Sequence, residues 1–84
     1  MIVCSFHDNK GRVWWGSFGG GAFYYQNGQF TPLKAPENNP VELPQYIRRI
    51  TQDNAGNLWY ATYSQGLYCL EPSGLLKEYT MRYS

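Results

Sequence analysis

Apolar and polar residues alternate along this chain in short runs, and one run occurs twice. Residues 8–17 and 53–62 each open with Asp-x-x-Gly, continue into a stretch rich in aromatic and β-branched residues, and carry Trp at the seventh position. Such stretches favour β-strands. Side chains alternate along a strand, which places Trp14 and Gly16 on one face and Trp15 on the other. Since neither face is polar, we expect both faces to be covered.

The two copies keep a constant spacing, because Asp8 and Asp53 are 45 residues apart. The correspondence continues without a gap through two further pairs, Gly21/Gly66 and Phe23/Tyr68. A strand-like unit that repeats about every 45 residues is typical of propeller blades. In Asp-x-x-Gly, the Asp side chain can accept a hydrogen bond from its own backbone two residues on, and the Gly can adopt positive φ. The motif therefore predicts a tight turn between antiparallel strands.

The pattern predicts an all-β fold of two four-stranded antiparallel meanders, each a β-propeller blade unit. The strands expected in the first unit are Ile2–His7, Arg12–Phe18, Ala22–Gln26 and Gln29–Thr31, with Asn27-Gly28 as a two-residue hairpin turn. Those expected in the second unit are Tyr46–Gln52, Asn57–Tyr63, Gly66–Glu71 and Leu75–Thr80. No helix is expected, and Met81–Ser84 is expected to fray.

Residues 32–45 interrupt the pattern with a proline at every fourth position. Proline cannot donate a hydrogen bond to a sheet ladder, so this stretch is interpreted as a surface connection. It divides the chain into a first blade repeat at residues 1–31 and a second at residues 46–84.

Composition narrows the choice of class. With 84 residues the chain forms at most one small domain. Aromatic residues make up 18% and charged residues only 15%, a composition that requires burial and argues against disorder. The net charge of +1 provides no basic field for nucleic acid. No apolar run is long enough for a membrane span, and the run at Ile2–Phe6 is too short for a signal peptide, so a leader would lie outside this sequence.

Residues that could support catalysis or metal binding are few and scattered. Cys4 and Cys69 occupy non-equivalent places in the two repeats, outside any CxxC pattern, which favours buried free thiols over a disulfide or a metal site. His7 is the only histidine, whereas zinc needs about four ligands and a catalytic triad needs an oriented base. Asp8 and Asp53 belong to the repeated turn. We therefore predict no catalytic, cofactor-binding or metal-binding residues, and no enzyme.

The repeated pattern Asp-x-x-Gly-x-φ-Trp-x-[Gly/Ala]-[Ser/Thr]-x-x-x-Gly, with φ apolar, resembles the two-component regulator propeller repeat. The second copy carries it at Asp53, Gly56, Leu58, Trp59, Ala61, Thr62, Gly66, Leu67 and Tyr68. The first copy carries it at Asp8, Gly11, Val13, Trp14, Gly16, Ser17, Gly21, Ala22 and Phe23. The resemblance implies the periplasmic sensor region of a hybrid two-component histidine kinase, as in Bacteroides-type bacteria. Such regions contain many repeats, so the chain is expected to be a fragment of a larger propeller.

Two details of the repeat lead to structural expectations. Ser5 stands where the second copy has Ile50, which predicts that the first strand is shifted by one residue or truncated. Trp14 and Trp59 occupy equivalent positions beside small residues, and we expect both rings to be buried in the core.

Three classes of function remain open. The resemblance favours a non-enzymatic sensory segment that binds a glycan; the alternatives are part of a carbohydrate-active propeller enzyme and an interaction scaffold without a small-molecule ligand. In a meander, successive turns alternate between the two ends of the sheet. The end opposite the Asp-x-x-Gly turns should carry Phe18, Tyr46, Tyr63 and Gln65, which are the candidate contacts for an oligosaccharide. That these are ordinary loop residues remains an open alternative.

The apolar faces and open strand edges also predict self-association. Propellers typically need about four to eight blades, and terminal units of repeat arrays normally carry polar caps. No such cap is evident in the sequence, and open edges can pair with another chain. We expect either a ring of three or four copies or a dimer.

Overall fold

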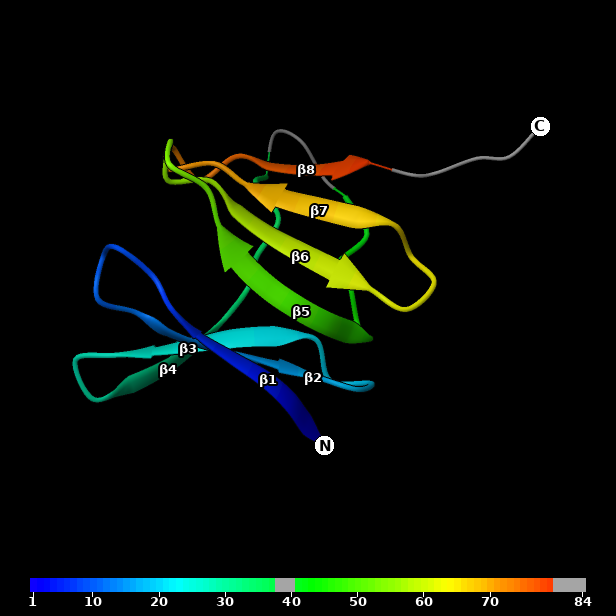
Figure 1. Ribbon diagram of the computed structural model, residues 1–84, viewed down its shortest axis with the longest axis horizontal. Helices are drawn as coiled ribbons and strands as arrows, with labels where there is room; N and C mark the ends of the chain where they lie inside the picture. The colour runs from blue at the N-terminus through cyan, green and yellow to red at the C-terminus, as the bar shows by residue number, and fades with distance from the viewer. Residues whose placement is uncertain (38–40, 80–84) are drawn as a thin grey trace.

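The computed structural model describes residues 1–37 and 41–79, and within these ranges all regular structure is β-strand. The first sheet contains β1 (Ile2–His7), β2 (Val13–Ser17), β3 (Ala22–Gln26) and β4 (Gln29–Pro32). The second contains β5 (Ile47–Gln52), β6 (Leu58–Thr62), β7 (Leu67–Leu70) and β8 (Leu76–Tyr79). Both are antiparallel meanders in sequence order, shown one above the other in Figure 1. The predicted fold class is confirmed; Thr80 and the predicted frayed end lie outside the described residues.

The two sheets have the same register. Ser5 pairs with Trp15 in the first sheet, and Ile50 pairs with Tyr60 in the second, 45 residues further along. Each sheet also has an irregularity between the first and third residues of its first strand. The expected shift or truncation of the first strand is therefore wrong: β1 is as long as β5, and Ser5 merely faces a different environment from Ile50.

Local turn chemistry explains how the strands are joined. Asn27 and Gly28 both have positive φ, at 54° and 80°, the geometry of a type I′ hairpin. The strand that follows includes Pro32, which pairs with Phe23, so β4 is one residue longer than expected. Proline is tolerated there because β4 is an edge strand, where a missing N–H costs no ladder hydrogen bond.

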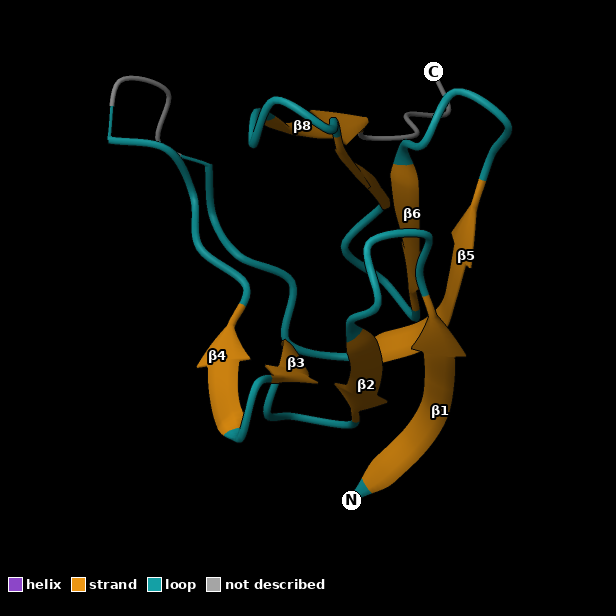
Figure 2. Ribbon diagram, turned by 90° about the vertical axis from the view of Figure 1, so that its left-hand side faces the viewer, coloured by secondary structure: helices purple, strands orange, loops and turns teal. Residues whose placement is uncertain are grey.

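The sheets stack through one face of each, and β1 contacts β5, which lies above it in Figure 2. The first sheet contributes the face that carries Trp14, whose side chain is only 1% exposed. The second contributes the face that carries Leu58 and Tyr60, and the ring of Tyr60 meets that of Trp14 edge-on with centroids 5.4 Å apart. The buried hydrophobic cluster contains Trp14, Ala22, Leu33, Ile47, Ile50, Leu58, Tyr60, Tyr68 and Leu76.

Gly16 lies where the second sheet packs closely against the first. A Cβ atom there would lie 2.8 Å from Cβ of Ile47 and 2.7 Å from Sγ of Cys4. Such distances leave no room for a side chain, so the small residue two positions after the tryptophan allows the second sheet to pack against the first.

Trp59 does not share the burial of Trp14, which corrects the expectation that both rings lie in the core. It alternates with Leu58 and Tyr60, so its side chain lies on the face of the second sheet that points away from the first, and it is only partly buried. That face also carries exposed Arg49 and Thr51. The expectation of two apolar faces on each unit is therefore only partly correct.

The connection between the sheets is more than a surface loop. Leu33 is buried in the core cluster, and its backbone N–H donates to the carbonyl of Ala22 at 2.9 Å. Pro44, near the other end of the connection, is also fully buried. Within the described residues, no helix is long and apolar enough to cross a membrane.

Candidate functional site

The repeated Asp-x-x-Gly turns lie at one end of the sheets and are held by their aspartates. One carboxylate oxygen of Asp8 accepts hydrogen bonds from the backbone N–H groups of Lys10 and Arg12, both at 2.9 Å. The other accepts from the indole Nε1 of Trp14 at 2.8 Å and from Nε of Arg12 at 2.5 Å. The predicted turn chemistry is confirmed, and the carboxylate also fixes the tryptophan ring.

The second turn repeats this arrangement. Asp53 accepts from the backbone N–H groups of Ala55 and Asn57 and from the indole of Trp59, at 3.0, 2.9 and 2.9 Å. The bond from indole to carboxylate was not anticipated. Its signal in the sequence was the constant six-residue spacing from Asp to Trp in both copies.

Hydrogen bonding sets the ionisation of both carboxylates. Burial alone would raise the pKa of Asp8, but the bonds from Arg12, Trp14 and Lys10 together hold that pKa below its ordinary value. The bonds from Trp59 and Asn57 lower the pKa of Asp53. Both side chains are therefore stabilised as anions that accept hydrogen bonds, a structural role and the opposite of a proton-donating acid.

At the other end of the sheets, the β2–β3 and β6–β7 loops are closed by a second repeated bond. The hydroxyl of Ser17 donates to the carbonyl of Gly21 at 2.9 Å, and that of Thr62 donates to the carbonyl of Gly66 at 2.6 Å. Both glycines have positive φ, which explains why the motif ends in glycine. The residues that follow Ser17 and Thr62 in these loops are Phe18 and Tyr63, and both are exposed.

Those residues meet in an exposed group of three rings, which we call the aromatic cluster: Phe18, Tyr46 and Tyr63. The ring of Phe18 lies edge-on to both tyrosines, with centroid distances of 4.9 Å to Tyr46 and 5.3 Å to Tyr63. The backbones are joined as well, because Tyr63 N–H donates to the carbonyl of Tyr46 at 3.1 Å. The three side chains remain 50%, 38% and 54% exposed in that order. Three of the four predicted contact residues thus form one surface.

Gln65, the fourth predicted residue, has a supporting position. Its side-chain carbonyl accepts from the backbone N–H of Gln45 at 2.9 Å and of Tyr46 at 3.3 Å. Its own backbone N–H donates to the hydroxyl of Thr62. Gln65 therefore ties the end of the connection to the β6–β7 loop and holds Tyr46 beside Tyr63.

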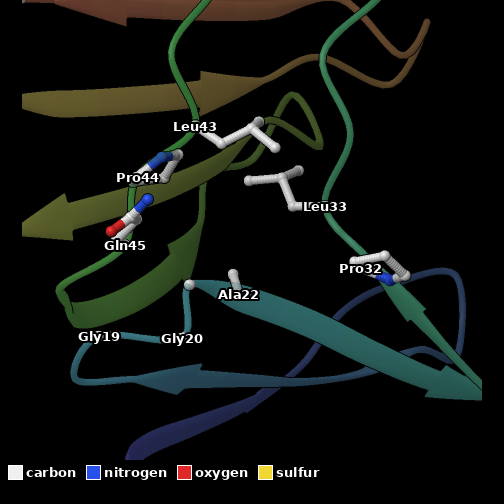
Figure 3. Close-up of a pocket in the computed structure, with 9 residues that line it drawn as sticks. Gly19, Gly20, Ala22, Pro32, Leu33, Leu43, Pro44 and Gln45 are labelled. Carbon is white, nitrogen blue, oxygen red and sulfur yellow. The ribbon is translucent and has the colours of Figure 1, made fainter.

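A half-open pocket of about 260 Å³ adjoins the aromatic cluster. In Figure 3, Leu33 and Leu43 point toward each other across it. At the rim of the pocket, the carbonyl of Gln45 accepts hydrogen bonds from the N–H groups of Gly19 and Gly21 at 2.8 and 2.9 Å. Gly19 directly follows Phe18 in the chain, and Gln45 directly precedes Tyr46, so the pocket and the aromatic cluster share the same two segments. The complete lining is Gly19, Gly20, Gly21, Ala22, Pro32, Leu33, Leu43, Pro44 and Gln45. Sequence reasoning missed this pocket because residues 32–45 were assigned to a surface connection.

The described residues hold no group of three or more His, Cys, Asp or Glu side chains placed to bind a metal ion. His7 is exposed on β1. Cys4 and Cys69 are free thiols; Cys69 is buried as predicted, whereas Cys4 is only half-buried. Burial raises the pKa of both thiols, which makes them poor nucleophiles.

Comparison with known proteins agrees with the repeat in the second unit. Residues 42–64 match the model of the two component regulator propeller family. This segment covers the end of the connection, β5, the second Asp-x-x-Gly turn and β6, and it includes Tyr46 and Tyr63 of the aromatic cluster. The family is a regulator propeller repeat and not an enzyme family. Searches among curated proteins and among solved structures found no match.

Proposed function

We propose that this chain is a non-enzymatic, ligand-binding propeller segment of a two-component sensor that acts outside the cytoplasm. Its ligand is an oligosaccharide, and the aromatic cluster binds it. The match of residues 42–64 to a regulator propeller supports the sensory role. The observation that carries the binding role is the convergence of Phe18, Tyr46 and Tyr63, from three separate loops, on one exposed surface.

The chemistry of this surface suits a neutral sugar. The C–H faces of pyranose rings pack on aromatic side chains, and tyrosine hydroxyls supply hydrogen bonds at the edge of such a contact. Large exposed apolar patches commonly mark binding sites. Here the rings lie on loops held by a rigid scaffold, which is where binding residues are usually found. The adjoining pocket, lined by glycines, apolar side chains and Gln45, offers room for one further group of the ligand.

Isothermal titration of the 84-residue chain with cellotetraose, xylotetraose and mannotetraose tests the binding role. Tyr63→Ala should weaken binding of the recognised sugar about two- to tenfold, since one aromatic contact contributes about 0.5–1.5 kcal/mol. His7→Ala is the control, because His7 is exposed at the end of β1 that lies away from the aromatic cluster. If Asp53→Asn folds but weakens sugar binding more than Tyr63→Ala does, the site lies at the end that carries the Asp-x-x-Gly turns and not at the aromatic cluster. If none of the three sugars binds, the proposal is refuted.

The location has a separate test. In cells that produce the native protein, antibody detection after selective release of the periplasm should recover this segment with periplasmic markers. Recovery with cytoplasmic proteins instead would refute the extracytoplasmic assignment.

A further inference from the structure

The outer face of the first sheet is a layer of aromatic rings, which we call the aromatic face: Trp15 and Phe23, which are partly buried, and Tyr25 and Phe30, which are exposed. Ring centroids lie 5.7 Å apart for Trp15 and Phe30 and 4.8 Å apart for Tyr25 and Phe30. Phe30 is 64% exposed. Aromatic rings at the surface lack packing contacts on their outer side, and a covering partner would supply them.

The register shows what kind of surface would cover the aromatic face. Pairing along the ladders makes its four residues equivalent to Tyr60, Tyr68, Leu70 and Leu76 in the second sheet. Those four lie in the core cluster or pack against it, and the ring of Tyr60 meets that of Trp14 on the first sheet. The aromatic face of the first sheet is therefore equivalent to the Tyr60 face of the second sheet, and within this chain the Tyr60 face packs against the face that carries Trp14.

The chain contains a second face of that kind. The outer face of the second sheet, which we call the Trp59 face, carries Trp59, Ala61, Leu67 and Cys69. The same pairing makes these residues equivalent to Trp14, Gly16, Ala22 and Tyr24. Trp59 is only partly buried, and its ring packs against that of Tyr79 with the ring centroids 5.8 Å apart.

We propose that copies of this chain associate head to tail, with the Trp59 face of one copy packed on the aromatic face of the next. The occupant of each face is a second copy because the contact repeats the interface that already joins the two sheets inside the chain. A contact between two different patches propagates in one direction and closes when the rotation per unit completes a circle. Since propellers close with about four to eight blades, the assembly contains about two to four chains.

The two faces differ in a way that disfavours pairing of like with like. Exposed Arg49 and Thr51 flank Trp59, so two Trp59 faces in contact would bring two arginines together and bury polar groups. Against the aromatic face, Arg49 meets rings, which attract a guanidinium group.

Light scattering after size exclusion, with two charged variants, tests this arrangement. Phe30→Glu blocks the aromatic face, and Thr51→Glu blocks the Trp59 face. Both positions are exposed within one chain, so each variant should fold, as thermal unfolding would verify. Tyr25→Glu is a second blocking variant of the aromatic face, and Lys34→Glu, in the connection, is the control.

At micromolar concentration the unchanged chain and Lys34→Glu should have at least twice the 9.7 kDa mass of one chain. Each blocking variant alone should be monomeric. An equimolar mixture of Phe30→Glu and Thr51→Glu should form a dimer, because one intact contact remains between them. A monomeric unchanged chain, a Thr51→Glu variant that still associates, or a mixture that stays monomeric would overturn the proposal.

Discussion

At the scale of single residues, the spacing that the two repeats share corresponds to particular hydrogen bonds. Asp8 and Asp53 each join a turn to the indole six residues later. Ser17 and Thr62 each close the loop at the opposite end of their sheet. Because charge-assisted bonds to a carboxylate are stronger than neutral ones, the aspartates are the residues whose ionisation affects the fold most directly.

Acid should weaken the fold through Asp8. Its pKa is below the ordinary value of 3.8 in the folded chain, so the stabilisation is complete above that value and is lost as the pH falls through the lower folded pKa. Asp8→Asn should lower the free energy of unfolding at neutral pH by about 1–3 kcal/mol. It should also make that free energy fall less between about pH 5 and pH 2. Denaturant titrations of both proteins across this range measure the difference, and equal acid sensitivity would contradict the assignment.

Two buried tyrosines should respond oppositely to loss of the hydroxyl. The hydroxyl of Tyr60 has no hydrogen-bond partner among the described residues, and burial raises the pKa of that group. That of Tyr68 donates to the carbonyl of Glu42 at 2.8 Å. Tyr60→Phe should raise the free energy of unfolding by about 1 kcal/mol, and Tyr68→Phe should lower it by about 1 kcal/mol. Urea denaturation compares them; a destabilising Tyr60→Phe would show that its hydroxyl is satisfied.

At the scale of elements, stacking of the two sheets makes equivalent strands unequal. In β2 the ring of Trp14 is covered by the second sheet, whereas in β6 the ring of Trp59 faces outward. Whether a residue of the repeat belongs to the core therefore depends on its neighbour and not on the strand itself.

This inequality can be measured with matched substitutions. Trp14→Ala should lower the free energy of unfolding by about 3–5 kcal/mol, as truncation of a buried aromatic residue does. Trp59→Ala should cost clearly less, because its ring loses fewer contacts. The comparison is made by chemical denaturation at a concentration where the chain is monomeric. Equal losses would mean that both rings are buried within one chain.

The sequence predicted the strands to within about a residue at each end, because Asp-x-x-Gly and Asn27-Gly28 fix where the chain reverses. It also predicted that Phe18, Tyr46 and Tyr63 share one end, since turns of a meander alternate. It did not predict which faces are covered, because periodicity assigns a residue to a face without naming what packs there. The burial of Leu33 and Pro44 was not predicted either, because the connection between the sheets has no hydrophobic periodicity that would show which of its residues reach the core.

At the scale of the whole molecule, two equivalent units stack with the Trp14 face of the first on the Tyr60 face of the second. This stacking brings the β2–β3 loop, the β6–β7 loop and the end of the connection together as the aromatic cluster. It also leaves the aromatic face and the Trp59 face outward. The proposed ligand site and the proposed self-association both depend on it.

Nuclear Overhauser contacts within a single chain test this stacking most directly. The structure predicts cross-peaks from the Hα protons of Gly16 to the side chain of Ile47, and from the ring of Trp14 to that of Tyr60. A sample that mixes labelled and unlabelled chains separates contacts within one chain from those between chains. Both contacts are expected within one chain. Their absence, or cross-peaks from Gly16 to Trp59 in their place, would contradict this stacking.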